Sequence, residues 1–275
     1  NVNLKLLFLF LKIYQYYKKK EAEFIKNADH IISLTNAGKV ELMKWPSYSN
    51  DKPITVIPCC SDMNHFTLTS PQEKKKGREL LGLPHDKLVI SYLGSVGTWY
   101  MLEEMLKLFS IILKKYSGAK FLFITHSLPQ LILSKLENYG LSKNDLVIKE
   151  ASRQEVPVFI KASDINVSFI KPFYSKLSSS PTKLGEVLAM GIPLISNSGV
   201  GDVEQIINES NAGFIIHQFK DQELIDAVNA IEELVNKNPE DIRTKAQSIY
   251  SLENGIEAYC RSYGKVFSES KCENG

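Results

Sequence analysis

A lysine, a glutamate and several hydroxyls lie close together in one stretch of the chain, residues 178–193, which reads SSSPTKLGEVLAMGIP. The pattern is typical of a loop that turns into a helix, and the first backbone N–H groups of a helix have no intrahelical partner. Together with Lys183 they form a site suited to a phosphate. Glu186, one turn further along, is placed to accept hydrogen bonds from a sugar or ribose hydroxyl. An ordinary amphipathic helix with a solvated lysine–glutamate pair is the alternative interpretation.

Local signals define this helix. Ser180 or Thr182 can cap its N-terminus, and Pro181 suits the first turn because its missing N–H is not needed there. The residues expected to face the core recur at helical spacing: Leu184, Val187 and Leu188. Gly191 is expected to end the helix before a short strand.

Short apolar strands alternate with amphipathic helices through most of the chain. Strands are expected at 88–93, 120–125, 146–149, 165–170, 193–196 and 213–216, and helices at 72–81, 100–116, 128–139, 154–161, 202–209 and 221–237. Apolar strands without polar alternation, placed between helices, predict an α/β fold with a parallel, doubly wound sheet. In such a sheet ligands bind at the carboxyl ends of the strands.

The first part of the chain is organised differently. A helix over 3–26 carries apolar stripes and the cluster Lys18-Lys19-Lys20. It is expected either to pack in a domain whose remainder is absent or to attach to anionic lipid. A strand, a helix capped by Thr35 or Asn36, a polar linker at 46–53 and a second strand follow. We place a domain boundary in the linker, and the lack of an initial methionine indicates a truncated start.

Composition excludes several classes of protein. With 275 residues and a net charge of +2, the chain has no strong electrostatic signal for nucleic acid. No run of apolar residues is long enough for a membrane span. The four cysteines have neither metal-ligand nor CxxC spacing, so free thiols in a reducing compartment are expected: Cys59, Cys60, Cys260 and Cys272.

The loops after the predicted strands contain the other candidate site residues. Gly94-Ser95-Val96-Gly97-Thr98 would let the backbone approach a ligand, although it matches neither the P-loop nor the dinucleotide-binding pattern. His126 ends a strand and is either a ligand contact or structural. Arg153 opens a helix, where it could meet a base, a phosphate or a carboxylate. Asp202 is interpreted as a helix N-cap. Neither a catalytic triad nor a metal cluster is indicated.

Several of these segments together resemble the retaining glycosyltransferases of family 4, which have the GT-B fold. The resemblance is carried by SSPTKL with E-x-x-AMG-x-P at 179–193, ADHIISLT at 28–35, VIPCCSD at 56–62, YLGS at 92–95, and R-x-EVP with ASDI at 153–165. It extends from about residue 21 to 236, in the order and spacing of the family. It implies two Rossmann-like domains with a nucleotide-sugar bound between them, mostly to the C-terminal one.

The resemblance implies roles for the candidate residues. Lys183 would stabilise the leaving diphosphate, and Glu186 would hold the ribose. Ser178 and Ser95 stand where the family often has glutamate and arginine, which makes Lys183 the main positive charge on the phosphates. The remaining expected donor contacts are Gly94, Ser95, Gly97, Thr98, His126, Arg153, Ser179, Ser180, Pro181, Thr182 and Leu184. Neither a cofactor nor a metal is implied.

Three parts are therefore expected. Residues 1–50 would be the end of an acceptor-side domain, and residues 51–237 the donor-binding domain. Residues 238–275 would form helices that cross back to the first domain, because one helix carries a stripe that must dock: Ile256, Tyr259, Tyr263 and Phe267. The C-terminal crossing is a feature of the family's fold.

The function implied is transfer of a sugar from a nucleotide-diphosphate sugar, with retention, to a glycan or lipid-linked acceptor. Surface polysaccharide synthesis in the cytoplasm, in contact with a membrane, is the expected setting. The first alternative is a donor-binding subunit that needs a separate partner chain, and the second is a sugar-nucleotide epimerase. The epimerase would need acid–base groups in the cleft, for which only His126 and Glu186 are candidates.

Overall fold

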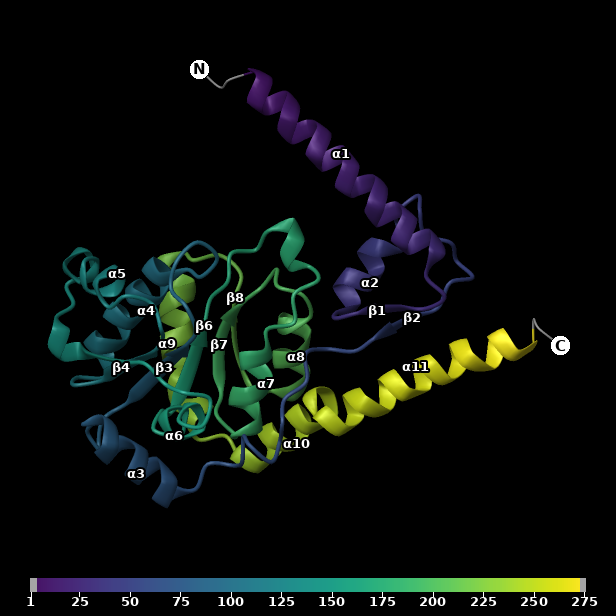
Figure 1. Cartoon of the computed structure of the whole chain (residues 1–275). Coiled ribbons are helices and arrows are strands. Elements are labelled where there is room, and N and C mark those ends of the chain that lie inside the picture. Colours follow the sequence, from purple (N-terminus) through teal and green to yellow (C-terminus); the bar gives the residue numbers. More distant parts are fainter. Residues whose placement is uncertain (1–3, 273–275) are drawn as a thin grey trace.

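A computed structural model describes the backbone of residues 4–272 and the side chains from residue 8 to residue 268. Six strands form a large sheet with helices on both faces (Figure 1). A small two-stranded sheet lies beside it. Two long helices, α1 (Leu4–Asn27) and α11 (Leu252–Cys272), project from this body.

The large sheet consists of strands β3 (Val89–Leu93), β4 (Lys120–Ile124), β5 (Leu146–Lys149), β6 (Ile165–Ser168), β7 (Leu194–Asn197) and β8 (Gly213–Ile216). Their order is β5-β4-β3-β6-β7-β8, and every neighbouring pair is parallel. The chain moves outward from β3 to β5 and then returns to place β6 on the other side of β3. The predicted α/β fold with a doubly wound parallel sheet is confirmed, and its strand order reverses between β3 and β6.

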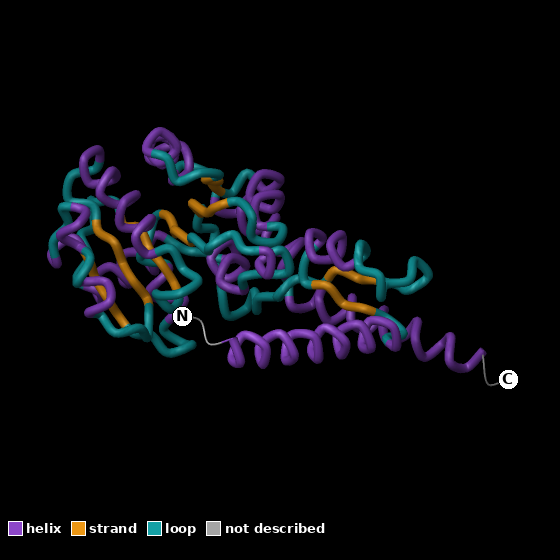
Figure 2. Tube along the Cα trace, turned by 90° about the horizontal axis from the view of Figure 1, so that it is seen from above, coloured by secondary structure: helices purple, strands orange, loops and turns teal. Residues whose placement is uncertain are grey.

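Two clusters of buried apolar side chains fill the two faces of this sheet. One lies under α4 (Leu102–Lys115) and α9 (Asp221–Val235), and the other under α6 (Val156–Ile160), α7 (Thr182–Ala189) and α8 (Val203–Ser210). Helix α3 (Pro71–Leu81) packs on α6 and α10 (Pro239–Tyr250) packs on α7, and both add buried side chains to the second cluster. From above, the strands run between the helical layers (Figure 2). Burial on both faces explains why these strands are apolar without alternation.

The helix expected at 128–139 is divided into two short pieces. These are α5 (Gln130–Leu133) and the 3-10 helix η1 (Leu136–Tyr139). Hydrogen bonds between residues three apart tighten the chain here, for example from Lys135 N–H to the Ile132 carbonyl at 3.1 Å. Two further 3-10 turns lie elsewhere, η2 (Lys143–Asp145) and η3 (Tyr174–Lys176).

The small sheet pairs β1 (Ile31–Ser33) with β2 (Ile54–Val56) in parallel, and α2 (Asn36–Leu42) lies between them in the chain. Thr35 caps α2 as predicted, because its hydroxyl accepts the Gly38 N–H at 2.9 Å. The expected boundary at residues 50 and 51 divides this sheet, since β2 pairs with β1 and not with the large sheet. Pairing across the linker was not visible in local sequence. We call residues 4–57 the N-terminal segment.

Among the described side chains of α1 most apolar ones are exposed, such as Phe8, Leu11, Tyr14 and Phe24, whereas Ile25 is buried. Part of the expected basic cluster is paired within the helix, Lys18 with Glu21 and Lys20 with Glu23. No helix in the described part of the chain combines the length and the apolar character needed to cross a bilayer.

Helix α11 extends from α10 to the small sheet, where the Ser262 hydroxyl lies 3.4 Å from that of Thr55. The expected apolar stripe docks only in part. Tyr259 and Tyr263 line a pocket of about 310 Å³ together with residues 28–30 and Ile32, yet they remain 42% and 61% exposed. Ile256 is 54% exposed. Gly255 of α11 lies against Cys60, in the loop that follows β2, where an added Cβ would have no room.

Candidate functional site

The reversal of strand order places the candidate site at the carboxyl ends of β3 and β6. The loop after β3 and the loop after β6 leave in opposite directions, which opens a crevice at this edge of a doubly wound sheet. Helix α7 begins at Thr182, directly after the second loop. The residues predicted to bind a phosphate therefore meet where the topology favours a ligand.

Packing fixes the position of α7. Leu184, Val187 and Leu188 are each about 1% exposed, as their spacing predicted. Gly185 permits close contact with α10, because a Cβ there would lie 2.9 Å from Tyr250 Cγ. Leu184 was expected to contact a donor, but its side chain belongs to the core and its N–H donates to the Pro181 carbonyl at 3.0 Å.

The N-terminus of α7 is not capped by a side chain, which corrects the expectation for Ser180 and Thr182. The Ser180 hydroxyl instead accepts the Cys59 N–H at 3.1 Å, and Thr182 is exposed. Pro181 occupies the N-cap position and not the first turn. The Ser180 hydroxyl, which the local sequence predicted to cap α7, thus bonds a residue more than a hundred positions away in the chain. The end of α7 is left without a capping side chain.

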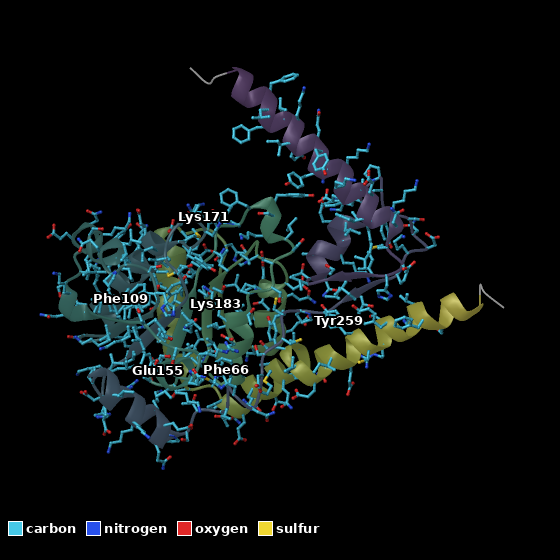
Figure 3. All side chains as sticks on the ribbon, in the orientation of Figure 1. Phe66, Phe109, Glu155, Lys171, Lys183 and Tyr259 are labelled. Carbon is cyan, nitrogen blue, oxygen red and sulfur yellow. The ribbon has the colours of Figure 1, made fainter. Side chains whose placement is uncertain are left out.

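Lys183 is the most unusual charged residue of the site. Its Nζ atom is buried and has no hydrogen-bond partner among the described residues. It lies 4.7 Å from the centre of the Tyr92 ring and 4.1 Å from that of Tyr100. Burial lowers the pKa of Lys183 to about 7, because desolvation disfavours the charged form. Figure 3 labels this side chain within the body of the large sheet, away from the projecting helices.

Glu186 is buried and pairs with Arg153, whose Nη1 lies 2.5 Å from the carboxylate oxygen Oε1. The guanidinium of Arg153 also lies 4.8 Å from the centre of the Phe66 ring. The backbone carbonyl oxygen of Arg153 is 3.0 Å from His65 Nε2. Of the three partners considered for Arg153, the structure supplies the carboxylate. The sequence did not indicate that Phe66 and His65 contact Arg153, because their segment has no regular pattern. The available signal was an aromatic residue directly after a histidine.

The glycine loop after β3 borders two separate pockets. Gly94, Ser95 and His126 line the first, of about 330 Å³, while Gly97 and Thr98 line the second, of about 310 Å³. Both glycines have positive φ, 133° at Gly94 and 141° at Gly97, which other residues rarely adopt. The need for glycine at these two positions is therefore conformational.

His126 is exposed in the first pocket and faces Glu150, with 3.8 Å between Nδ1 and Oε2. Ser127 also steadies this loop, since its hydroxyl accepts the Val96 N–H at 2.9 Å. His126 therefore lies at the exposed rim of the pocket. Its neighbour Ser127 forms the hydrogen bond to the glycine loop.

A third pocket, of about 180 Å³, separates the large sheet from the N-terminal segment and is lined by Ser179, Ser180 and Pro181. Asp202 also borders it. Asp202 occupies the N-cap position of α8 but makes no capping bond there. Its carboxylate instead accepts N–H groups of Asn36 and Ala37 at 2.6 and 2.9 Å. Asp202 therefore caps α2 of the other sheet, which corrects the local interpretation.

The predicted residues are thus only partly brought together. Lys183 lies against Gly94 at the end of β3, and Gly94 lines one pocket together with Ser95 and His126. Glu186 and Arg153 form a neighbouring ion pair. Thr182 is exposed, and the remaining candidates lie in other pockets or in the core, as described for Gly97, Thr98, Ser179, Ser180, Pro181 and Leu184. Among the described side chains, no group of three or more histidines, cysteines and carboxylates could hold a metal ion.

Comparison with known proteins gives a family and a fold. The family model described as glycosyl transferases group 1 matches residues 73–248. A search of curated proteins gives no match. Similar solved structures include a glycosyltransferase from Rickettsia africae ESF-5, with 18% identity and a TM-score of 0.69 over 90% of this chain and 66% of that one.

Two further structures agree with this result. WaaG, a glycosyltransferase involved in lipopolysaccharide biosynthesis, has 15% identity and a TM-score of 0.70 over 85% of this chain and 62% of that one. Anabaena HepE in complex with UDP has 15% identity and a TM-score of 0.73 over 88% of this chain and 65% of that one. These matches confirm a GT-B-type fold. The chain spans somewhat less than two thirds of the length of these structures.

Proposed function

Because the chain belongs to the group 1 glycosyltransferases, we propose that it transfers a sugar from a nucleotide-diphosphate sugar to a glycan or lipid-linked acceptor. HepE has been solved with UDP, and with UDP and glucose, which supports a donor of this chemical class. WaaG acts in lipopolysaccharide synthesis, which supports a surface polysaccharide as the product. We place the reaction in the cytoplasm, against a membrane, without a metal or cofactor.

One observation carries this proposal, the ammonium group of Lys183. A buried cation without a hydrogen-bond partner in the described residues is costly, and an anion placed against it would remove that cost. The group lies at the switch point of the sheet, on the first turn of α7 and next to Gly94. A diphosphate is the anion that a helix N-terminus and a glycine loop bind together.

The proposed reaction proceeds with retention of the sugar's anomeric configuration. As the bond between sugar and diphosphate breaks, negative charge grows on the leaving phosphate. Lys183 and the N–H groups at the start of α7 would stabilise that charge. Glu186 would accept hydrogen bonds from the ribose, with Arg153 orienting its carboxylate. The pocket beside Gly94 and His126 would hold the rest of the nucleotide.

The acceptor is assigned to the N-terminal side. The chain spans less than two thirds of the length of the similar structures, so the N-terminal segment is proposed to be part of a larger acceptor-side domain. The apolar side chains exposed on α1 favour a second reading, a donor-binding subunit completed by a partner chain. An epimerase gains no support, because Glu186 is held by Arg153 and His126 is exposed.

Calorimetry with UDP, GDP, ADP and CMP tests the proposal. One nucleoside diphosphate should bind, and Lys183→Met should weaken it by about tenfold or more, the equivalent of about 1.4 kcal/mol. Lys75→Met on the exposed surface of α3 is the matched control and should bind as the wild type does. Equal affinity of Lys183→Met and wild type, or no binding of any diphosphate, would overturn the proposal.

A further inference from the structure

We infer that Tyr92 and Tyr100 form an aromatic cradle that positions the ammonium of Lys183 for the donor's diphosphate. This inference rests on the proposed function and adds two positioning residues to it. Neither tyrosine was singled out by sequence, because Tyr92 reads as part of an apolar strand and Tyr100 as the start of a helix.

The cradle is built from two elements. Tyr92 lies in β3 and is fully buried, and Tyr100 lies in the loop that follows. The two rings meet edge to face, with centroids 6.1 Å apart and an interplanar angle of 67°. Lys183 Nζ lies within 5 Å of both ring centres, the range in which a cation is attracted by an aromatic face. The ammonium of Lys183 is therefore attracted by two aromatic rings, where a buried lysine would ordinarily pair with a carboxylate.

Hydrogen bonds connect the cradle to the glycine loop. The Tyr92 hydroxyl donates to the Ser95 carbonyl at 2.6 Å, and the Tyr100 N–H donates to the Gly97 carbonyl at 3.0 Å. The backbone of Tyr100 also pairs with that of Ile170, in the loop just after β6. The rings that hold Lys183 are thus fixed to both loops that border the crevice.

Gly94 completes the arrangement. A Cβ added there would lie 3.2 Å from Lys183 Nζ and 3.3 Å from the Tyr92 hydroxyl oxygen. The ammonium consequently lies directly against the backbone of the glycine loop. A phosphate that approaches this backbone comes within reach of Lys183, and the cradle keeps the lysine at that place when no donor is bound.

The rings attract the ammonium but accept no strong hydrogen bonds from it. Burial accordingly holds the pKa of Lys183 at about 7, and the titratable groups that face it are Tyr92 from β3 and Tyr100 from the loop. Desolvation is the cause of this shift. Phosphate oxygens would supply the missing acceptors and favour the charged form. Donor binding above pH 7 should therefore be accompanied by uptake of a proton at Lys183.

Lysine labelled with carbon-13 at Cε allows this to be tested by NMR on the whole chain. The Hε signal of Lys183, assigned by its loss in Lys183→Met, should be shifted upfield by the two rings and should titrate near pH 7. Tyr100→Leu should reduce the upfield shift to the part that the Tyr92 ring causes, whereas Tyr100→Phe should retain the full shift. Tyr92→Phe keeps the buried ring and removes only the bond to Ser95.

Binding of the diphosphate selected by calorimetry supplies the second measurement. Tyr100→Leu should weaken it by about three- to thirtyfold, and Tyr100→Phe should restore it to within about twofold of wild type. Absence of an upfield lysine signal, or unchanged affinity for the diphosphate in Tyr100→Leu, would overturn the cradle. If the wild-type chain still binds the diphosphate, the proposed function is left intact. A Tyr100-dependent lysine signal that no diphosphate perturbs would instead overturn the proposed function and the donor-positioning role.

Discussion

The large sheet and the N-terminal segment bury their apolar residues to very different extents. The strands of the large sheet are covered on both faces, and its two clusters contain side chains that are almost fully buried, such as Phe109 and Leu188. Among the described residues, none before Met63 belongs to either cluster. In the N-terminal segment, residues such as Val40 and Phe24 are 55% and 71% exposed.

This difference separates what the large sheet does alone from what needs a neighbour. Lys183 and Glu186 lie on α7, which packs in the core of the large sheet, whereas the loop before α7 also touches the N-terminal segment, since the Thr35 hydroxyl donates to the Leu177 carbonyl at 2.6 Å. The N-terminal segment is held by contacts to other parts of the chain, among them Asp202 and the Ser262 hydroxyl of α11. Substitutions in the two regions should therefore differ in their effects on stability.

Leu188→Ala should have the largest effect on stability. Leu188 is 1% exposed in the core beneath α7, and truncating a buried leucine typically costs about 2–5 kcal/mol. Urea denaturation followed by circular dichroism measures the free energy of unfolding. Val40→Ala in α2 is the matched control and should change it by less than about 0.5 kcal/mol. Equal losses in both variants would contradict the contrast between the two regions.

Lys183→Met should make the chain more stable at pH 7 while it weakens donor binding. The folded chain holds Lys183 with a pKa of about 7, against an ordinary value of 10.5. Between these values the unfolded chain binds more protons, so the stability of the wild type rises with pH by at most about 1.4 kcal/mol per unit.

The advantage of Lys183→Met should therefore be constant below pH 7 and shrink between about pH 7 and 10.5. Urea denaturation at pH 7.0, 8.5 and 10.0 follows it, with Lys75→Met as the exposed control. A difference that stays the same over this range would show that the folded chain keeps Lys183 protonated throughout.

Asp202→Ala should loosen the contact between the two regions by about 1–2 kcal/mol, the usual cost of losing a cap. The carboxylate accepts N–H groups of Asn36 and Ala37 at the start of α2, while α8 makes no use of it. Amide hydrogen exchange should become faster in residues 31–42 and stay unchanged in residues 203–210. Asp202→Asn should lie between wild type and alanine. Faster exchange in α8 itself would contradict the assignment of Asp202 to α2.

Phe24→Ala should have the smallest effect, below about 0.5 kcal/mol, because the ring is 71% exposed on α1. Thermal unfolding of the chain measures it, and Ile25→Ala provides the contrast because Ile25 is 8% exposed. A large loss from Phe24→Ala would mean that the ring is buried in solution, for example against a second molecule, and dilution of the protein would then lower the melting temperature further.

Much of the fold could be predicted because its signals are local. The alternation of apolar strands and amphipathic helices defined the large sheet, and α7 buries the residues that its spacing indicated. Thr35 caps α2 as expected, since a cap joins residues only three apart. The length of the helix expected at 128–139 was less predictable, because short-range hydrogen bonds converted part of it to a 3-10 turn.

Local patterns in the sequence were enough to indicate the apolar face of α7 and some residues of the switch point, such as Lys183 and Gly94, but they did not indicate Tyr92 and Tyr100. Tertiary structure alone decided the partners of these side chains. It joined Arg153 to Glu186 across 33 positions and Asp202 to Asn36 across 166, and it enclosed Lys183 between two tyrosines. The physical reason is range: a periodic pattern acts over a few residues, whereas a hydrogen bond or ion pair depends on which distant segment packing brings within about 3 Å.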